Sequence, residues 1–182
     1  GFMDIGSENR RSLFHLIKSD FTRKQAIFLA DGFDVPMWKI LLSDGTTANI
    51  IYRLMQFFSR CGLLPLAILF QYLNKLLNHC VIGVKADFSN GFVIMHPVGI
   101  VINSKVSGGI NITLESGVVM GDAKGASPLL GNTIFIGAGA KIIGGMIIGD
   151  VVNVGANAVV VKDVPSNTTA VGVPAKLIPH SL

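Results

Sequence analysis

Histidine is the side chain best suited to proton transfer near neutral pH, and one histidine of this chain lies in a distinctive context. His15 and His79 precede a regular apolar pattern, His180 follows it, and only His96 lies within it. An imidazole has an ordinary pKa of about 6.5, so it can act as a general base toward a substrate hydroxyl. The alternative is a structural, hydrogen-bonded histidine at a subunit contact. His96 is therefore the first candidate for chemistry, and the surrounding pattern has to decide between the two roles.

The pattern around His96 repeats an aliphatic residue every six positions. Its first block comprises Ile82, Phe88, Ile94, Ile100, Val106, Ile112 and Val118, and its second comprises Leu130, Ile136, Ile142, Ile148, Val154 and Val160. A period of six fits neither an α-helix nor an ordinary strand. It is typical of hexapeptide repeats, in which each short strand points one aliphatic side chain inward and the next strand turns a corner. The ladder predicts a parallel β-helix in which these side chains occupy equivalent inward positions.

The ladder is interrupted once, between residues 121 and 132. The segment Gly121-Asp-Ala-Lys-Gly-Ala-Ser-Pro128 is rich in turn formers, and the register before and after it agrees modulo six. We therefore expect a loop that leaves the solenoid and returns to it, the kind of segment that often grips a ligand. After Pro165 the repeat ends, and residues 171–176 are expected to cover the unpaired edge of the last coil.

Residues 5–80 carry helical patterns instead. A first helix is expected to be capped by Ser7 and to carry a stripe that includes Leu13 and Leu16. Further helices are expected at residues 24–30, 36–42, 48–60 (capped by Thr47) and 65–78, with the Ser43-Asp44-Gly45 turn ending the helix at 36–42. The last two are apolar on more than one side, which indicates burial against helices or another subunit, or contact with a membrane surface. The chain thus divides into a helical region, 1–79, and a β-helix domain, 80–182.

Composition limits the classes of function. Half of the 182 residues are apolar and the net charge is +4, a bias too mild and scattered for nucleic-acid binding. The apolar stretch 62–70 is far shorter than the roughly 18 residues of a membrane span, and the opening residues lack the pattern of a signal peptide. Cys61 and Cys80 form no CxxC pair, so we expect reduced thiols that pack in a core. We expect a cytoplasmic protein, with at most a weak contact to the inner face of the membrane.

Several motifs match a known family. The segments Ile136-Gly-Ala-Gly-Ala-Lys-Ile142, Gly155-Ala-Asn-Ala-Val-Val160 and Gly172-Val-Pro-Ala-Lys176 resemble the coenzyme-A-binding end of hexapeptide-repeat acyltransferases. The stretch 91–103, with His-Pro before Gly-Ile-Val-Ile, resembles the serine acetyltransferase branch, and most closely its members associated with capsule and exopolysaccharide synthesis. The resemblance covers about residues 45–177. It implies a left-handed parallel β-helix with an N-terminal α-helical arm, an exception to the right-handed crossover rule, assembled as a homotrimer.

The resemblance also implies an activity and a set of site residues. The co-substrate would be acetyl-CoA, with no metal, and His96 would be the general base. The residues placed along acetyl-CoA are Gly121, Ala138, Ala156 and Lys176, with Lys141 and Lys124 as weaker candidates for its phosphates. Glycine and alanine let the pantetheine approach the backbone closely, and lysine offers charge to phosphate.

The acceptor side departs from the family. The aspartate expected fifteen residues before the histidine is Val81, the carboxylate directly before it is Met95, and a second histidine corresponds to Ser127. Groups that would hold an amino acid are thus missing, which favours a sugar or glycan hydroxyl as the acceptor. We expect Asp87, Asn90 or His79 to orient His96. We count Asp31, Asp87 and Asn90 as substrate-side candidates.

Three functions therefore compete. The first is an acetyl-CoA-dependent O-acetyltransferase acting on a sugar or glycan precursor. The second is a serine O-acetyltransferase of cysteine biosynthesis, against which Val81, Met95 and Ser127 argue. The third is a non-catalytic β-helix scaffold. Its zinc-dependent relative, the γ-class carbonic anhydrase pattern, needs three histidines at subunit contacts, and the ladder contains only His96.

Overall fold

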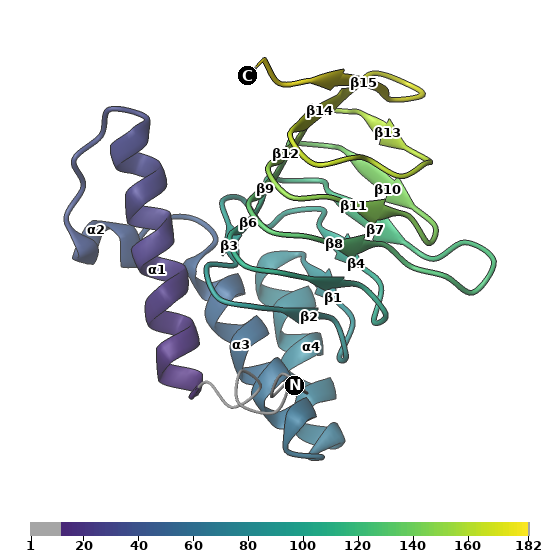
Figure 1. Ribbon diagram of the computed structural model, residues 1–182. Helices are drawn as coiled ribbons and strands as arrows, with labels where there is room; N and C mark the ends of the chain where they lie inside the picture. Colours follow the sequence, from purple (N-terminus) through teal and green to yellow (C-terminus); the bar gives the residue numbers. More distant parts are fainter. Residues whose placement is uncertain (1–11, 182) are drawn as a thin grey trace, which may run out of the picture.

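The structure, a computed structural model that describes residues 12–181, consists of a helical arm beside a β-solenoid (Figure 1). The arm contains α1 (Leu13–Ala30), α2 (Met37–Leu41), α3 (Thr46–Arg60) and α4 (Leu64–Asn78). The strands of the solenoid are β1 (Val81–Ile82), β2 (Asp87–Phe88), β3 (Val93–Ile94), β4 (Val101–Ile102), β5 (Ser107–Gly108), β6 (Ile112–Leu114), β7 (Val119–Gly121), β8 (Leu129–Leu130), β9 (Ile134–Ile136), β10 (Lys141–Ile143), β11 (Ile147–Ile148), β12 (Val152–Val154), β13 (Val159–Val160), β14 (Thr168–Val171) and β15 (Lys176–Pro179).

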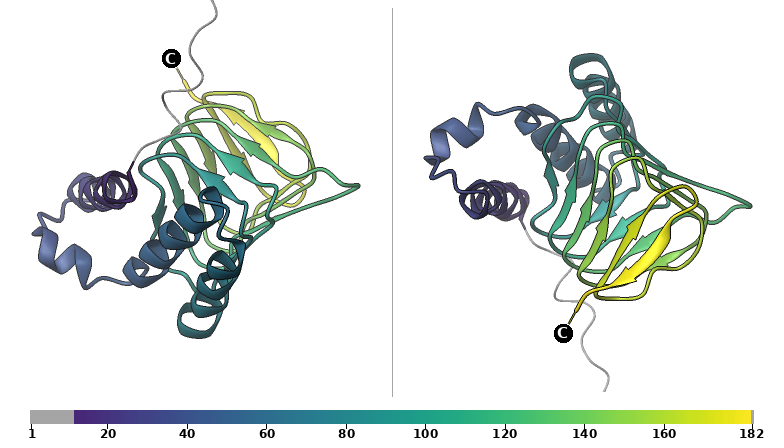
Figure 2. Two further views of the ribbon diagram at one scale, coloured as in Figure 1. Left: turned by 90° about the horizontal axis from the view of Figure 1, so that it is seen from below. Right: turned by 90° about the horizontal axis from the view of Figure 1, so that it is seen from above.

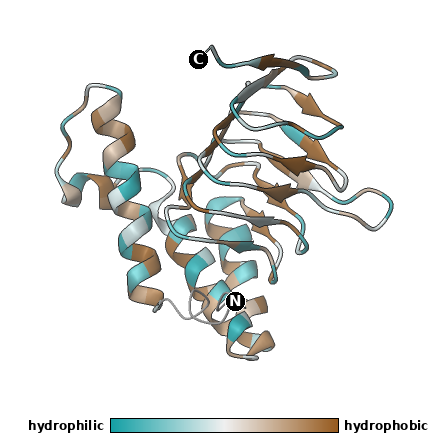
Figure 3. Ribbon diagram, in the orientation of Figure 1, coloured by the Kyte–Doolittle hydropathy of each residue, from teal (hydrophilic) through white to brown (hydrophobic). Residues whose placement is uncertain are grey.

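The strands form the three faces of a prism, seen from both ends in Figure 2. The first sheet has the order β1-β4-β7-β10-β13, the second β2-β5-β8-β11, and the third β3-β6-β9-β12-β14-β15. All pairings are parallel except β14 with β15, where residues 176–179 fold back over the last coil. Figure 3 shows hydrophobic residues along most of these strands, as a shared interior requires. The predicted parallel β-helix with a helical arm is confirmed.

The coils are not of equal length, which corrects the predicted uninterrupted first block. Val81 pairs with Val101, twenty residues later, whereas Val101 pairs with Val119, eighteen residues later. The first coil therefore carries two extra residues, and they lie in the corner between β3 and β4, which holds His96. The next coil pairs Val119 with Lys141, twenty-two residues later, so the loop after β7 adds four. The two insertions add up to six residues, one full hexad, so the six-residue register of the sequence is the same before and after the loop.

Consequently, the residues of the first block before His96 and those after it occupy two different inward positions of the coil. Ile82 is stacked on Ile102, not on Ile100. Ile100 and Val118 occupy a second inward position two residues earlier, and they are fully buried as well. Both positions face the core, so apolar residues at either one preserve the six-residue period in the sequence.

The helical arm also differs in detail from the expectation. Residues 24–30 are the second half of one long helix, α1, whose N-cap is Ser12: its hydroxyl accepts the His15 amide hydrogen at 3.2 Å. The predicted Ser7 cap lies outside the described residues. Helix α3 begins at Thr46, with Gly45 as its N-cap, which is two residues earlier than the start at Ala48 that a Thr47 cap predicts.

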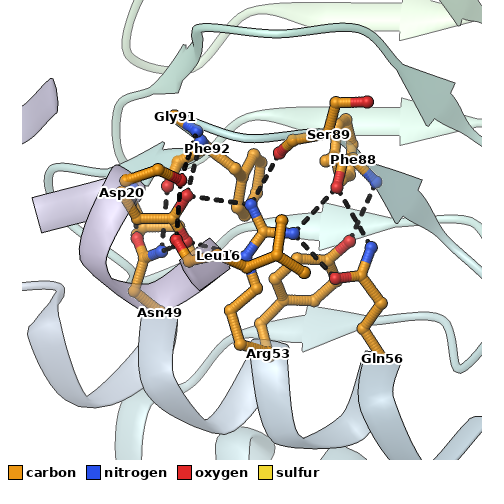
Figure 4. Close-up of polar contacts among 12 residues, drawn as sticks. Leu16, Asp20, Asn49, Arg53, Gln56, Phe88, Ser89, Gly91 and Phe92 are labelled. Carbon is orange, nitrogen blue, oxygen red and sulfur yellow. Dashed lines mark hydrogen bonds and ion pairs between the residues drawn. The ribbon is translucent and has the colours of Figure 1, made fainter. Parts of the chain in front are cut away.

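A buried network around Arg53 attaches the arm to the first coil (Figure 4). The guanidinium donates to both carboxylate oxygens of Asp20 on α1, at 2.7 and 2.9 Å, and to the carbonyls of Phe88 and Ser89, at 2.8 and 2.6 Å. Asn49 of α3 bridges Asp20 and β3. Because both charges are fully buried, removal of either would leave the other unpaired, and α1 is thereby held beside the third sheet.

The surface of the arm is apolar in places. Helix α4 exposes Leu69, Tyr72, Leu76 and Leu77. No helix among residues 12–181 is both long enough and apolar enough to cross a membrane. Cys80 is buried as expected, and burial raises the pKa of its thiol to about 12, but Cys61 is exposed at the end of α3, contrary to the predicted core position.

Candidate active site

The corners between the third and first sheets stack into one column that begins with His96. Backbone hydrogen bonds join its successive levels, from Gly117 N–H to Val98 O, from Gly139 N–H to Ser116 O and from Asn157 N–H to Ala138 O, at 2.8–2.9 Å. We call the residues 96–99, 115–117, 137–139 and 155–157 the corner column. Neighbouring coils lie about 4.8 Å apart, so the column extends for roughly 14 Å above His96.

His96 is paired with a carboxylate from the helical arm. Its Nδ1 lies 2.8 Å from Asp44 Oδ2, and the two side chains are 57% and 60% exposed. A carboxylate can only accept a hydrogen bond, so Nδ1 carries the hydrogen, and in the neutral imidazole Nε2 then has the free lone pair. This is the tautomer that a general base requires.

Two residues of the arm fix Asp44 beside the corner column. Gly45 has φ of +82°, and a Cβ on it would collide with the carbonyl oxygen of Ile94, so only glycine lets the turn approach β3 this closely. Lys24 of α1 donates from its ammonium group to the carbonyl oxygens of Asp44 and Ile94. Burial lowers the pKa of Lys24 to about 8, partly offset by Asp44 and Glu115. The Asp44 turn is thus attached to the strand that leads into His96.

The predicted partners of His96 were wrong. Asp87 lies on β2 in the second sheet and accepts hydrogen bonds from Gln56 and Arg60, both at 2.6 Å. His79 ends α4 in a left-handed conformation, and its carbonyl accepts from Gly99. The Asn90 carbonyl accepts from the Asn111 backbone. Asp44 was missed because Ser43-Asp44-Gly45 is typical of a helix-ending turn, and nothing in the linear sequence places that turn against His96.

The predicted cofactor residues are only partly brought together. Ala138 and Ala156 occupy successive levels of the corner column, and both are exposed. A Cβ on Gly137 would approach the Ala156 nitrogen to 2.7 Å, so the packing requires glycine at position 137. Lys176 begins β15, next to Val171 at the top of the third sheet. These positions leave a surface of small side chains leading up from His96, which suits the close approach of a pantetheine arm.

The other predicted cofactor residues have different surroundings. Gly121 lies at the far end of β7, where the chain leaves the solenoid in the loop that projects in Figure 1. Lys124 lies in that loop with φ of +54°. The Lys141 ammonium donates to the carbonyls of Gly117 and Gly139 at 2.8 and 2.7 Å, so it binds the corner column itself.

A cavity of about 410 Å³ lies between α1 and the third sheet, beside the start of the corner column. Its wall includes Arg23, Asp31, Met95, Asn111, Glu115 and Phe135. Glu115 is the neighbour of Met95 on the adjacent coil, because Met95 N–H bonds to the carbonyl of Leu114. Burial raises the pKa of Glu115, and the nearby His96 and Lys24 partly oppose this. Of the substrate-side candidates, Asp31 therefore lines this cavity, whereas Asp87 lies on a different face.

Comparison with known proteins assigns the chain to a family. No protein-family model matches it. A serine acetyltransferase of Helicobacter pylori (strain J99) is 36% identical over 146 residues, which are 78% of this chain and 85% of that protein. The chain belongs to the serine acetyltransferase family. This membership confirms the predicted enzyme class, an acetyl-CoA-dependent O-acetyltransferase.

Solved structures agree with this assignment. Serine acetyltransferase from Brucella abortus strain S19 superimposes with a TM-score of 0.84 at 27% identity, over 92% of this chain and 69% of that one. A serine acetyltransferase in complex with CoA gives 0.83 at 27% identity, over 92% and 70%. Soybean serine acetyltransferase in complex with serine gives 0.81 at 28% identity, over 92% and 70%. The CoA complex of a family member supports acetyl-CoA as the co-substrate.

These relatives correct the predicted acceptor. A sugar or glycan acceptor, with a role in polysaccharide synthesis, was inferred from Val81, Met95 and Ser127. The curated relatives and the superimposable structures are serine acetyltransferases, so that main prediction is wrong and the alternative is favoured. The finer resemblance to the capsule and exopolysaccharide members is likewise unsupported. Asp44 and Glu115, from other parts of the chain, place carboxylates at the same corner, so Val81, Met95 and Ser127 do not leave it without acidic groups.

Proposed function

We propose that this protein is a serine O-acetyltransferase, which transfers the acetyl group of acetyl-CoA to the hydroxyl of serine. The observation that carries the proposal is the His96–Asp44 pair at the base of the corner column, with Ala138 and Ala156 above it. The family assignment supports these substrates, because its members include one solved with CoA and one solved with serine.

In the proposed reaction, His96 Nε2 takes the proton of the serine hydroxyl as that oxygen attacks the thioester carbonyl. The C–S bond then breaks, the acetyl group stays on the serine oxygen, and the coenzyme leaves as a thiolate that takes up the proton. Asp44 holds the imidazole in the required tautomer and stabilises the imidazolium while it carries the proton. This scheme uses no metal ion, and we expect turnover to survive dialysis against a chelator.

We also propose that the working form is a homotrimer. The outward residues Leu129 and Ile147 are paired on adjacent strands of the second sheet and are 51% and 58% exposed, an apolar strip suited to a subunit contact. Sedimentation equilibrium tests this: a mass of three chains is expected, and a monomer at micromolar concentration would contradict it.

The central test measures the release of free thiol from acetyl-CoA with L-serine, L-threonine, monosaccharides and nucleotide sugars as acceptors. L-serine is expected to be the preferred acceptor. His96→Ala is expected to lower kcat by about 10²- to 10⁴-fold. The matched control is His15→Ala, which removes an exposed histidine of α1 and is expected to leave kcat unchanged. Turnover with a sugar but not with serine would refute the proposal, as would near-normal kcat in His96→Ala.

A further inference from the structure

The cavity beside the corner column contains two opposite charges that do not pair with each other. Arg23 lines the cavity from α1, and Glu115 lines it from the level of the corner column directly above His96. Within residues 12–181, neither the Arg23 guanidinium nor the Glu115 carboxylate has a hydrogen-bond or ion-pair partner, and Arg23 Nε is buried without one. Burial of an unpartnered guanidinium nitrogen is unfavourable, so the position indicates a group that is bound during function.

The other charged groups near this cavity have different roles. The Lys24 ammonium is committed to the carbonyls of Asp44 and Ile94. Asp44 is bonded to His96 and to its own turn. Asp31 lies on the exposed rim, at the C-cap of α1. Arg23 and Glu115 are therefore the pair left to meet a ligand inside the cavity.

A zwitterion complements two opposite charges that are held apart in one cavity. An α-amino acid carries a carboxylate that suits the planar guanidinium and an ammonium group that suits a carboxylate. The volume of about 410 Å³ falls in the range of small-molecule sites, and Phe135 and Ile27 supply apolar wall. Glu115 lies beside Met95, the residue before His96, because the two coils are stacked. An amino acid whose ammonium group binds Glu115 would therefore have its side-chain hydroxyl close to the His96 imidazole.

We propose that Arg23 binds the carboxylate and Glu115 binds the ammonium group of the amino-acid acceptor, so that these two residues determine specificity for an α-amino acid. The inference rests on the proposed function for the reaction but makes a separate claim about which residues recognise the substrate. It also explains how a serine acetyltransferase can work with Met95 and Ser127 at its acceptor side.

The test removes each charge from the protein and from the substrate in turn. The probes are L-serine, L-serinamide, which lacks the carboxylate, and 3-hydroxypropionate, which lacks the ammonium group. Arg23→Gln and Glu115→Gln are each expected to lower kcat/KM for L-serine by about 10- to 100-fold, with KM for acetyl-CoA unchanged. Arg23→Gln should no longer discriminate between serine and serinamide, and Glu115→Gln should no longer discriminate between serine and 3-hydroxypropionate.

Controls and binding measurements separate the two claims. Arg60→Gln and Asp34→Asn alter exposed charges elsewhere on the arm and should leave all three kcat/KM values unchanged, and thermal unfolding verifies that every variant folds. Calorimetric titration with L-serine measures binding without turnover. Loss of binding in both cavity variants supports the inference even if no acetyl transfer to serine occurs, which would overturn only the proposed function. Unchanged binding and unchanged substrate discrimination in folded variants would overturn the inference while serine turnover persisted.

Discussion

Replacement of Asp44 tests how the arm serves the β-helix. The pair with His96 is a charge-assisted hydrogen bond, a class worth about 1.5–3 kcal/mol when shielded from water. Both side chains are more than half exposed, so solvent screening reduces the contribution toward roughly 1–1.5 kcal/mol. We therefore expect Asp44→Ala to lower kcat by about tenfold, since each 1.4 kcal/mol corresponds to a factor of ten.

Asp44→Asn is expected to be worse than Asp44→Ala. Asp44 Oδ1 accepts the backbone hydrogen of Gly45 at 3.0 Å, and the amide oxygen of the Asn variant would keep this contact. The amide NH₂ would then point at His96 Nδ1, which must become an acceptor and leave its hydrogen on Nε2. That is the wrong tautomer for a base, so kcat should fall by about 100-fold.

The assay is thiol release at saturating acetyl-CoA and L-serine for the wild type and both Asp44 variants. Asp34→Asn, an exposed aspartate between α1 and α2, serves as the control and should retain wild-type kcat. The reasoning fails if Asp44→Asn is as active as Asp44→Ala or better. It also fails if His96→Ala and His96→Ala/Asp44→Ala differ markedly in kcat, because Asp44 is meant to act only through His96.

Three further predictions concern the arm. Gly45→Ala should lower kcat about as much as Asp44→Ala, whereas Gly32→Ala, at a similar φ of +88° but in open space, should cost about 1–2 kcal/mol of stability without loss of kcat. The pKa of Lys24 is about 8 in the folded chain, against the ordinary value of 10.5 in the unfolded chain. Between these two pH values the unfolded chain holds a proton that the folded chain lacks. The free energy of unfolding should therefore rise with pH, by up to about 3 kcal/mol. Lys24→Met should abolish that rise in urea titrations at pH 7.5 and 10; an equal rise in both proteins would contradict the assignment. Arg53→Met should cost about 3–5 kcal/mol in urea unfolding because Asp20 stays buried and unpaired, and a loss below 1 kcal/mol would count against the network in Figure 4.

The sequence predicted what depends on local periodicity. The six-residue ladder is a local signal, and it predicted the β-helix correctly. It could not reveal the shift at His96, because both inward positions of the hexad accept aliphatic residues and the two insertions together equal one repeat. Pairing register is a three-dimensional property, and here two compensating changes hid it.

The acceptor side was predicted poorly for a different reason. Val81 and Met95 were read along the chain as the loss of two carboxylates. In the structure, Asp44 approaches His96 across fifty-two residues of sequence, and Glu115 lies beside Met95 only because the coils stack. Groups contributed by another coil or by the arm have no fixed spacing in the sequence, so their absence at one position says little about the assembled site.

The stacked corners also set the distance from His96 to the end of the solenoid. Each coil adds one level of about 4.8 Å between His96 and the hairpin of β14 and β15. Residues 141–158 form one such level, since Lys141 pairs with Val159 eighteen residues later at the same place on the prism. The distance from His96 to Lys176 can therefore change only in whole steps, by gain or loss of a coil. The length available to a long, thin co-substrate along this edge is therefore a whole number of coil spacings.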